Sequence, residues 1–223
     1  MTDSTDTLVH PQDICYRVFE LVRAKQFDAA EKLLSHWLGK TEEPVGCALL
    51  HSAYGVLEKS RGAYKSALRH YERAEKLLPT DPAIKLITAQ LLIDVFKETD
   101  RAIRKCRQVE KLLPDNPVML HHARTLEGLA YVVSGNRRKA AEQCAKSMEN
   151  AFQGFLTCDN LNFLLVEMLV RKGWELELCH RFITQALALA QEHREAEWVA
   201  RLTTMLDAMS VTDRAEHPDR PAS

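Results

Sequence analysis

Hydrophobic residues recur every three or four positions along most of the chain, which is the spacing of amphipathic helices. Two clear runs are Leu68, Tyr71, Ala74 and Leu78, and then Leu86, Ala89, Ile93 and Phe96. The runs are separated by prolines, which end helices or begin them. No stretch alternates between hydrophobic and polar residues as a half-buried strand would. The pattern therefore predicts an all-α protein.

Two segments of the chain are close copies of each other. ALRHYERAEKLLPTDP at 67–82 aligns with AIRKCRQVEKLLPDNP at 102–117, and both close on EKLLP, a two-residue turn and a second proline. The offset between them is 35 residues. A period of this size indicates a helical repeat protein, in which each unit is a pair of helices that stacks on its neighbours.

The same register extends in both directions. A small residue comes early in the second helix of each predicted pair, at Ala30, Ala67, Ala102 and Ala140, with spacings of 37, 35 and 38 residues. Leu178 continues the series after a further 38 residues, although its side chain is not small. Small side chains allow two helix axes to approach within about 8–10 Å. These positions should therefore mark where the two helices of a pair meet.

The repeat resembles the tetratricopeptide repeat (TPR), a helix–turn–helix unit of about 34 residues with the motif W-x2-L-G-x2-Y, then A-x3-F, then P. The best-matching unit has Gly55 in the glycine position, Ala67 and Tyr71 in the A-x3-F positions, and a closing Pro79. The third unit departs from the motif, with Cys106 in the aromatic position, and no unit has the first tryptophan. The resemblance covers residues 11 to about 190.

This resemblance implies an all-α, right-handed α-solenoid of antiparallel helix pairs with a C-terminal capping helix. We expect five pairs and a cap, or eleven helices, over residues 11–209. The cap is predicted at 193–209, where Trp198, Leu202, Met205 and Leu206 repeat at helical spacing. Residues 1–10 and 210–223 are predicted to be disordered tails.

Composition and termini point to a cytoplasmic protein. The net charge is −1, so no overall field attracts nucleic acid or a membrane surface. The first residues are acidic and polar, unlike a secretory signal. The longest apolar run, 161–170, is far shorter than the roughly 20 residues of a transmembrane helix. The six cysteines are scattered and form no C-x-x-C motif, which fits a reducing compartment.

Motifs that carry chemistry are missing from the sequence. The nine histidines form no H-x3-H or H-E-x2-H pattern, and there is no P-loop, G-x-G-x-x-G or G-x-S-x-G motif. Cys106 and Cys144 take equivalent core positions in successive repeats, which favours buried thiols over nucleophiles. A catalytic triad stays open, because chain order alone does not exclude one. We predict no enzymatic activity, no cofactor and no metal.

The resemblance to TPR proteins implies that the first helix of each pair lines an inner, concave groove. At the groove positions the chain is partly apolar, and exposed apolar surface of this kind marks binding sites. The predicted partner-binding residues are Ile84, Ile87, Leu91, Thr125, Leu129, Val132 and Phe163. Four of them, namely Ile87, Leu91, Leu129 and Val132, are expected to be exposed in the free protein. The preferred function is a scaffold or adaptor that holds a peptide or helix of another protein in this groove.

Two alternatives remain open. One is a TPR chaperone that shields hydrophobic segments of a secreted or assembling partner. The other is binding of an anionic polymer such as RNA through basic residues on the second helices, at Arg101, Arg104, Lys105, Arg107, Arg137 and Arg138. No aromatic residues interleave this basic stripe as base platforms would, which argues against nucleic acid. Association with a second copy of the chain is also left open.

Overall fold

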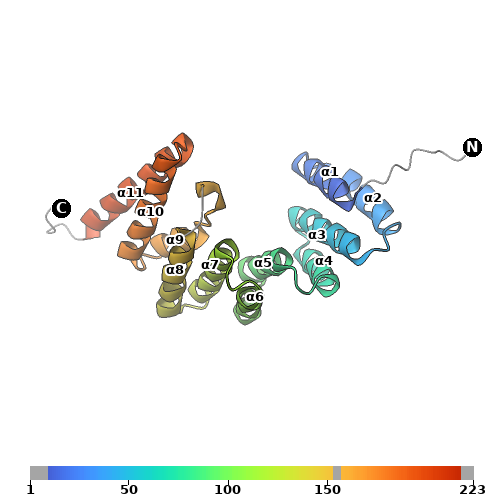
Figure 1. Ribbon diagram of the computed structural model, residues 1–223, viewed down its shortest axis with the longest axis horizontal. Coiled ribbons are helices and arrows are strands. Elements are labelled where there is room, and N and C mark those ends of the chain that lie inside the picture. The colour runs from blue at the N-terminus through green and yellow to red at the C-terminus, as the bar shows by residue number, and fades with distance from the viewer. Residues whose placement is uncertain (1–9, 153–156, 217–223) are drawn as a thin grey trace, which may run out of the picture. The chain divides into compact units, whose positions relative to one another are not determined.

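All the regular structure in the described part of the chain is helical (Figure 1). The computed structural model describes the backbone of residues 10–152 and 157–216, with side chains up to residue 209. Within these ranges the α-helices are α1 (Pro11–Arg23), α2 (Phe27–Leu38), α3 (Pro44–Ser60), α4 (Tyr64–Leu77), α5 (Pro82–Leu91), α6 (Thr99–Leu112), α7 (Pro117–Val133), α8 (Arg137–Ala151), α9 (Leu164–Arg171), α10 (Leu176–Glu192) and α11 (Ala196–Glu216). A π-helix, η1 (Leu92–Phe96), continues α5, and a 3-10 turn, η2 (Cys158–Asn160), precedes α9.

The helices pack as pairs, as predicted. Helix α1 packs against α2, α3 against α4, α7 against α8 and α9 against α10, and the terminal α11 packs against α10. The chain divides into two compact units, Met1–Phe96 and Lys97–Ser223. The boundary falls inside the third predicted repeat, with α5 and η1 in the first unit and α6 in the second. The all-α class, the paired helices and the terminal helix are thus confirmed.

The first helices of four repeats begin in the same way. A proline lies in the first turn of α1, α3, α5 and α7, where a missing backbone N–H costs no helical hydrogen bond. Side chains cap the N–H groups just beyond it. The Asp81 carboxylate accepts from the N–H of Ile84 at 2.9 Å, and the Asn116 side chain accepts from Met119 at 3.0 Å. These local signals fix where each repeat starts.

The turn inside each pair has the same backbone conformation in all five repeats. One residue lies in the left-handed region, with φ between 57° and 78°, at Lys25, Gly62, Lys97, Gly135 and Gly173. Each stands five residues before the predicted small-residue position of its repeat, including Leu178 in the fifth. Glycine adopts this conformation without strain, whereas the two lysines adopt it at a cost. The predicted repeat register is therefore confirmed along the whole described solenoid.

Close helix packing explains the small residues of the first unit. Ala67 is fully buried in a cluster with Tyr71 and Leu91. A Cβ atom on Gly55 would lie 2.3 Å from Cε1 of Tyr71, so a larger residue there would displace the ring. Gly55 and Tyr71 are thus complementary, and they come from the glycine and aromatic positions of the TPR motif.

The second unit is organised around α7 and ends on α11. Helix α7 packs against α6, α8 and α9, and a Cβ atom on Gly128 would lie 2.3 Å from Cδ2 of Leu165 in α9. At the end of the unit, the Trp198 ring of α11 stacks on Phe163 with centroids 5.2 Å apart, and Leu202 is fully buried. Helix α11 therefore covers the last apolar face, as a capping helix does.

The predicted terminal tails, 1–10 and 210–223, lie only partly within the described residues. Helix α11 runs on to Glu216, so the predicted boundary at 209 ended the helical region too early. The remaining seven residues, 217–223, lie outside the described residues. So do residues 1–9 of the predicted N-terminal tail, whereas His10 is the N-cap of α1 and accepts a hydrogen bond from the N–H of Gln12.

The packing at Ala67 yields a test of the register. Replacing Ala67 with Leu should overpack the contact with Tyr71 and lower the free energy of unfolding by about 1–3 kcal/mol. Ala63→Leu changes an exposed residue in the preceding turn and should shift it by less than about 0.5 kcal/mol. Urea denaturation measures both. Equal losses for the two variants would contradict the assignment of Ala67 to the helix crossing.

Candidate functional site

The predicted groove residues are mostly core residues. Ile87 is 39% exposed, but the other six are buried, namely Ile84, Leu91, Thr125, Leu129, Val132 and Phe163. The expectation that Leu91, Leu129 and Val132 are exposed is therefore wrong. Leu91 joins the core cluster of Ala67 and Tyr71, and Leu129 and Val132 belong to α7, which three other helices contact. Their burial was not visible in the sequence because it depends on these neighbouring helices.

Thr125 belongs to a buried hydrogen-bond network rather than to a surface. Its hydroxyl lies 3.0 Å from that of Ser147, which in turn lies 2.7 Å from Nδ1 of His121. The backbone N–H of Asn162 donates to Nε2 of His121 at 2.8 Å, so the proton of the neutral ring sits on Nδ1 and is donated to Ser147. Burial lowers the pKa of His121 to about 4. This histidine ties α7 to α8 and to the segment before α9.

The predicted basic stripe is partly neutralised. Arg104, Arg107, Arg137 and Arg138 are exposed, and Arg101 and Lys105 are half-buried. Three of the six form ion pairs within the second unit, namely Arg101 with Glu98 at 2.5 Å, Arg107 with Glu127 at 3.0 Å and Arg137 with Glu175 at 2.8 Å. Their charge is therefore offset by the protein's own carboxylates.

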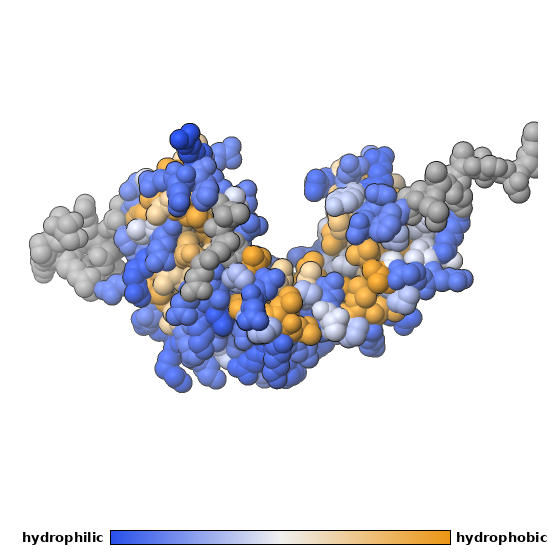
Figure 2. Space-filling model, viewed as in Figure 1, coloured by the Kyte–Doolittle hydropathy of each residue, from blue (hydrophilic) through white to orange (hydrophobic). Residues whose placement is uncertain are grey.

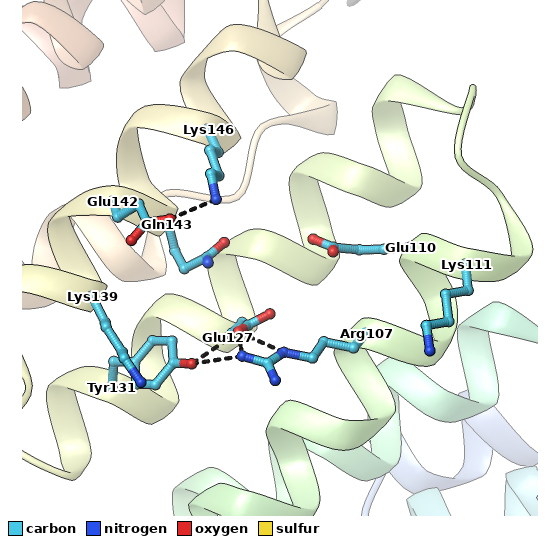
Figure 3. Close-up of a pocket in the computed structure, with 9 residues that line it drawn as sticks. All are labelled: Arg107, Glu110, Lys111, Glu127, Tyr131, Lys139, Glu142, Gln143 and Lys146. Carbon is cyan, nitrogen blue, oxygen red and sulfur yellow. Dashed lines mark hydrogen bonds and ion pairs between the residues drawn. The ribbon is translucent and has the colours of Figure 1, made fainter.

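One of these ion pairs lies in a cleft that the sequence did not predict. The charged cleft has a volume of about 390 Å³ and is formed by α6, α7 and α8 (Figure 3). It is lined by Arg107, Glu110, Lys111, Glu127, Tyr131, Lys139, Glu142, Gln143 and Lys146. In Figure 3, α6 supplies one wall and α8 the opposite wall, and the side chains of α7 lie between them.

The floor of the charged cleft is a buried carboxylate with fixed partners. Glu127 is only 2% exposed. One of its oxygens accepts from two nitrogens of Arg107, at 3.0 and 3.1 Å, and from the hydroxyl of Tyr131 at 3.1 Å. Arg107 also donates to the Tyr131 hydroxyl at 3.0 Å. Bonding to Glu127 raises the pKa of Arg107, and burial, followed by the charge of Glu127, raises the pKa of Tyr131.

The other carboxylates of the charged cleft also have basic partners. Glu110 pairs with Arg124 at 3.3 Å, and Glu142 pairs with Lys146 at 2.6 Å. Bonding to Lys146 lowers the pKa of Glu142. The ammonium group of Lys139 lies over the Tyr131 ring, 5.2 Å from its centroid. The cleft therefore presents a dense network of charges in which every carboxylate is already paired.

An equivalent cleft exists in the first unit. The α2–α4 cleft, of about 550 Å³, is lined by Glu31, Ser35, Leu38, Gly39, Tyr54, Glu58, Ser66 and His70. By repeat register, Tyr54 corresponds to Glu127 and Ser35 to Arg107. The contact between the two positions is kept, since the Tyr54 and Ser35 hydroxyls are 2.5 Å apart. Both clefts thus form where two successive second helices flank a first helix.

The α2–α4 cleft also brings two histidines together. The His70 ring stacks on Tyr54, with centroids 4.5 Å apart, and its Nδ1 lies 3.1 Å from Nδ1 of His51. Burial is the main cause that lowers the pKa of each histidine. The sequence signal for both clefts is the polar residue just before the repeat glycine, Tyr54 or Glu127, which lies outside the predicted inner-face positions.

Five of the six cysteines are buried thiols with a raised pKa. Burial raises the pKa of Cys15 to about 11 and that of Cys144, Cys158 and Cys179 to about 12, and it also raises the pKa of Cys106. These thiols stay protonated at neutral pH, and the thiolate is the reactive form. Among the described residues, no group of three or more metal-ligand side chains is placed to hold an ion. None of the described helices has the length and apolarity needed to cross a bilayer.

The Arg107–Glu127 pair can be tested by a double-mutant cycle. Arg107→Met leaves the buried Glu127 carboxylate with fewer donors and should lower the free energy of unfolding by about 1.5–3 kcal/mol. Adding Glu127→Gln should recover part of this loss, because the amide carries no charge. Arg104→Met, three residues earlier on α6, is the matched control and should cost less than about 0.5 kcal/mol. Equal losses for Arg104→Met and Arg107→Met would contradict the structural role of the pair.

Burial of neutral His121 predicts acid sensitivity. Between pH 6.5 and about 4 the unfolded chain binds a proton at His121 that the folded chain does not, so stability falls as the pH falls through this window. The full shift corresponds to a loss of about 3 kcal/mol. When urea unfolding is measured from pH 8 down to pH 4, the free energy of unfolding should fall less for His121→Gln than for the wild type. The control variant His180→Gln, at an exposed histidine, should show the same pH dependence of stability as the wild type. If His121→Gln also showed the wild-type pH dependence, burial of His121 would not be its cause.

Comparison with known proteins adds information about the fold. No protein-family model and no curated protein match the sequence. The structure is similar to TTC0263, a thermophilic TPR protein of Thermus thermophilus, with 15% identity over 88% of this chain and 98% of that chain and a TM-score of 0.61. It is also similar to PilF of Pseudomonas aeruginosa, with 12% identity over 95% of this chain and 93% of that chain and a TM-score of 0.60. A third similar structure is PilW, a type IV pilus biogenesis factor, with 12% identity over 94% of each chain and a TM-score of 0.60. The chain therefore has the fold of tetratricopeptide-repeat proteins.

Proposed function

We propose that this chain is a non-catalytic scaffold that binds a partner protein through the exposed face of its first helices. The observation that carries the proposal is the position of Ile87 on α5. Its side chain is 39% exposed, while its neighbours Ile84 and Leu91 on the same helix are buried in the core of the first unit. An isoleucine held at the surface of a helix that packs against α4 is an apolar contact for a partner.

The binding face is smaller than the groove expected from the sequence. Of the seven predicted contacts, Ile87 is exposed and the other six are buried. By repeat register, the position of Ile87 corresponds to Ser52 on α3, which is half-buried. We expect the partner to lie as an extended peptide or a short helix along such positions, as in other recognition by helical repeats.

The properties of the titratable groups favour binding over catalysis. Five cysteines are held protonated by burial, and both ring nitrogens of His121 are engaged in hydrogen bonds. All six cysteines are unpaired, which supports a reducing compartment such as the cytoplasm.

The two alternative functions have less support. On the face shown in Figure 2, hydrophobic residues form small areas separated by hydrophilic ones, whereas a chaperone for hydrophobic segments needs a broad apolar surface. For an RNA binder, three of the six predicted basic residues are already engaged with the chain's own carboxylates.

The proposal is tested by capturing partners on the immobilised chain from an extract of its native cell, with quantitative mass spectrometry. Ile87→Asp should lose the partner, because a charge left unpaired in an interface costs several kcal/mol. Val133→Asp is the matched control, since Val133 is also 39% exposed and lies on a first helix outside the predicted contacts. Both variants should melt like the wild type. Retention of every captured protein by folded Ile87→Asp would overturn this binding face.

A further inference from the structure

We infer that the charged cleft between α6, α7 and α8 binds an acidic segment of a protein partner. This inference rests on the proposed scaffold function and names a second contact and the chemistry that it recognises. The cleft lies on the second helix of one repeat and both helices of the next, so it is separate from the α5 face that carries Ile87.

The charges of the cleft do not cancel. Its three carboxylates, Glu110, Glu127 and Glu142, each have a basic partner within the second unit. Those partners are Arg124, Arg107 and Lys146, which leaves two lining lysines in excess. Lys111 forms no hydrogen bond or ion pair with any described residue, and Lys139 lies over the Tyr131 ring. The surplus positive charge at the rim favours an anionic group in the cleft.

The floor of the cleft is held by hydrogen bonds, and its wall offers an amide that can hydrogen-bond a peptide. Arg107 and Tyr131 both donate to the buried Glu127 carboxylate, so the floor cannot rearrange without breaking these hydrogen bonds. On the wall, the side-chain oxygen of Gln143 is buried and has no hydrogen-bond partner among the described residues. In Figure 3 this amide points into the cleft. It can turn to bond the main chain of a peptide whose acidic side chains reach Lys111 and Lys139.

An acidic peptide fits this cleft better than a nucleic acid does. A polynucleotide carries a phosphate on every residue and would bring some of them against the Glu110 and Glu142 carboxylates. The face of Tyr131, the aromatic side chain that lines the cleft, is covered by Lys139 and is not free to stack on a base. A peptide can place carboxylates at the lysines and neutral residues at the glutamates.

The equivalent cleft of the first unit provides an internal comparison. The α2–α4 cleft is lined by two carboxylates, Glu31 and Glu58, and by no lysine or arginine. Ser66 and Gly39 stand at the positions that Lys139 and Lys111 take in the charged cleft. The two clefts share their place in the repeat but differ in charge, so an acidic segment should select the one formed by α6, α7 and α8.

The test uses the full chain and a fluorescein-labelled dodecapeptide of alternating glutamate and glycine, followed by fluorescence anisotropy. The double variant Lys111→Glu/Lys139→Glu should weaken binding at least about tenfold. The matched control Arg171→Glu/Lys172→Glu makes the same change in charge at exposed residues of the same unit and should weaken it less than about twofold. A dodecapeptide with glutamine in place of glutamate should not bind, and circular dichroism checks that all variants fold.

Three outcomes would overturn the inference. The first is equal affinity of the two double variants for the acidic peptide. The second is binding of the glutamine peptide to the wild type as tightly as the acidic peptide. The third is tighter binding of a twelve-nucleotide uridine RNA than of the acidic peptide, through the same two lysines. The capture experiment with the native extract is run on the same variants. Partners that are retained while the peptide fails to bind would refute the acidic-segment inference alone. Capture that yields no partner on any form of the chain would refute the scaffold function, whatever the peptide does.

Discussion

Within each compact unit, the fold depends on the close approach of paired helices, as between α3 and α4 or α7 and α8. The predicted crossing residue stands five residues after the left-handed residue of the turn in every repeat, and it is an alanine in the first four repeats and Leu178 in the fifth. In the second repeat these two residues are Ala67 and Gly62.

This dependence explains which features could be predicted from the sequence. The repeat register rests on local signals, namely the crossing alanines, the turn residues and the prolines at the first helices, and the structure agrees with it even where lysine replaces glycine at Lys25 and Lys97. The end of α11 differs from the predicted boundary at 209 because the mostly polar residues after Met209 resemble a tail in composition, whereas the helix continues to Glu216.

Exposure was harder to predict because it depends on helices distant in the sequence. Leu129 and Val132 stand at inner-face positions in the resemblance to TPR proteins, yet they are buried on a helix that contacts three others. The two clefts, in contrast, are surface features that the sequence does not predict. Each needs two second helices to flank a first helix, so Arg107 and Glu127 meet across 20 residues of sequence that show no motif for the contact. A polar residue next to a repeat glycine is the signal to look for in other helical repeats.

The described part of the chain has a TPR-like helical-repeat fold with few large exposed hydrophobic residues, and the proposed contacts are the α5 face and the charged cleft. The proposal rests above all on contact between the α5 face and a partner in the cell. The most direct measurement is photocrosslinking in the native cell, with a photoreactive amino acid placed at position 87 and, in a parallel strain, at position 133. We expect a distinct protein to be crosslinked from position 87 and to be absent from the crosslinks at position 133. Identical crosslinks from both positions, or none from position 87, would contradict the proposal.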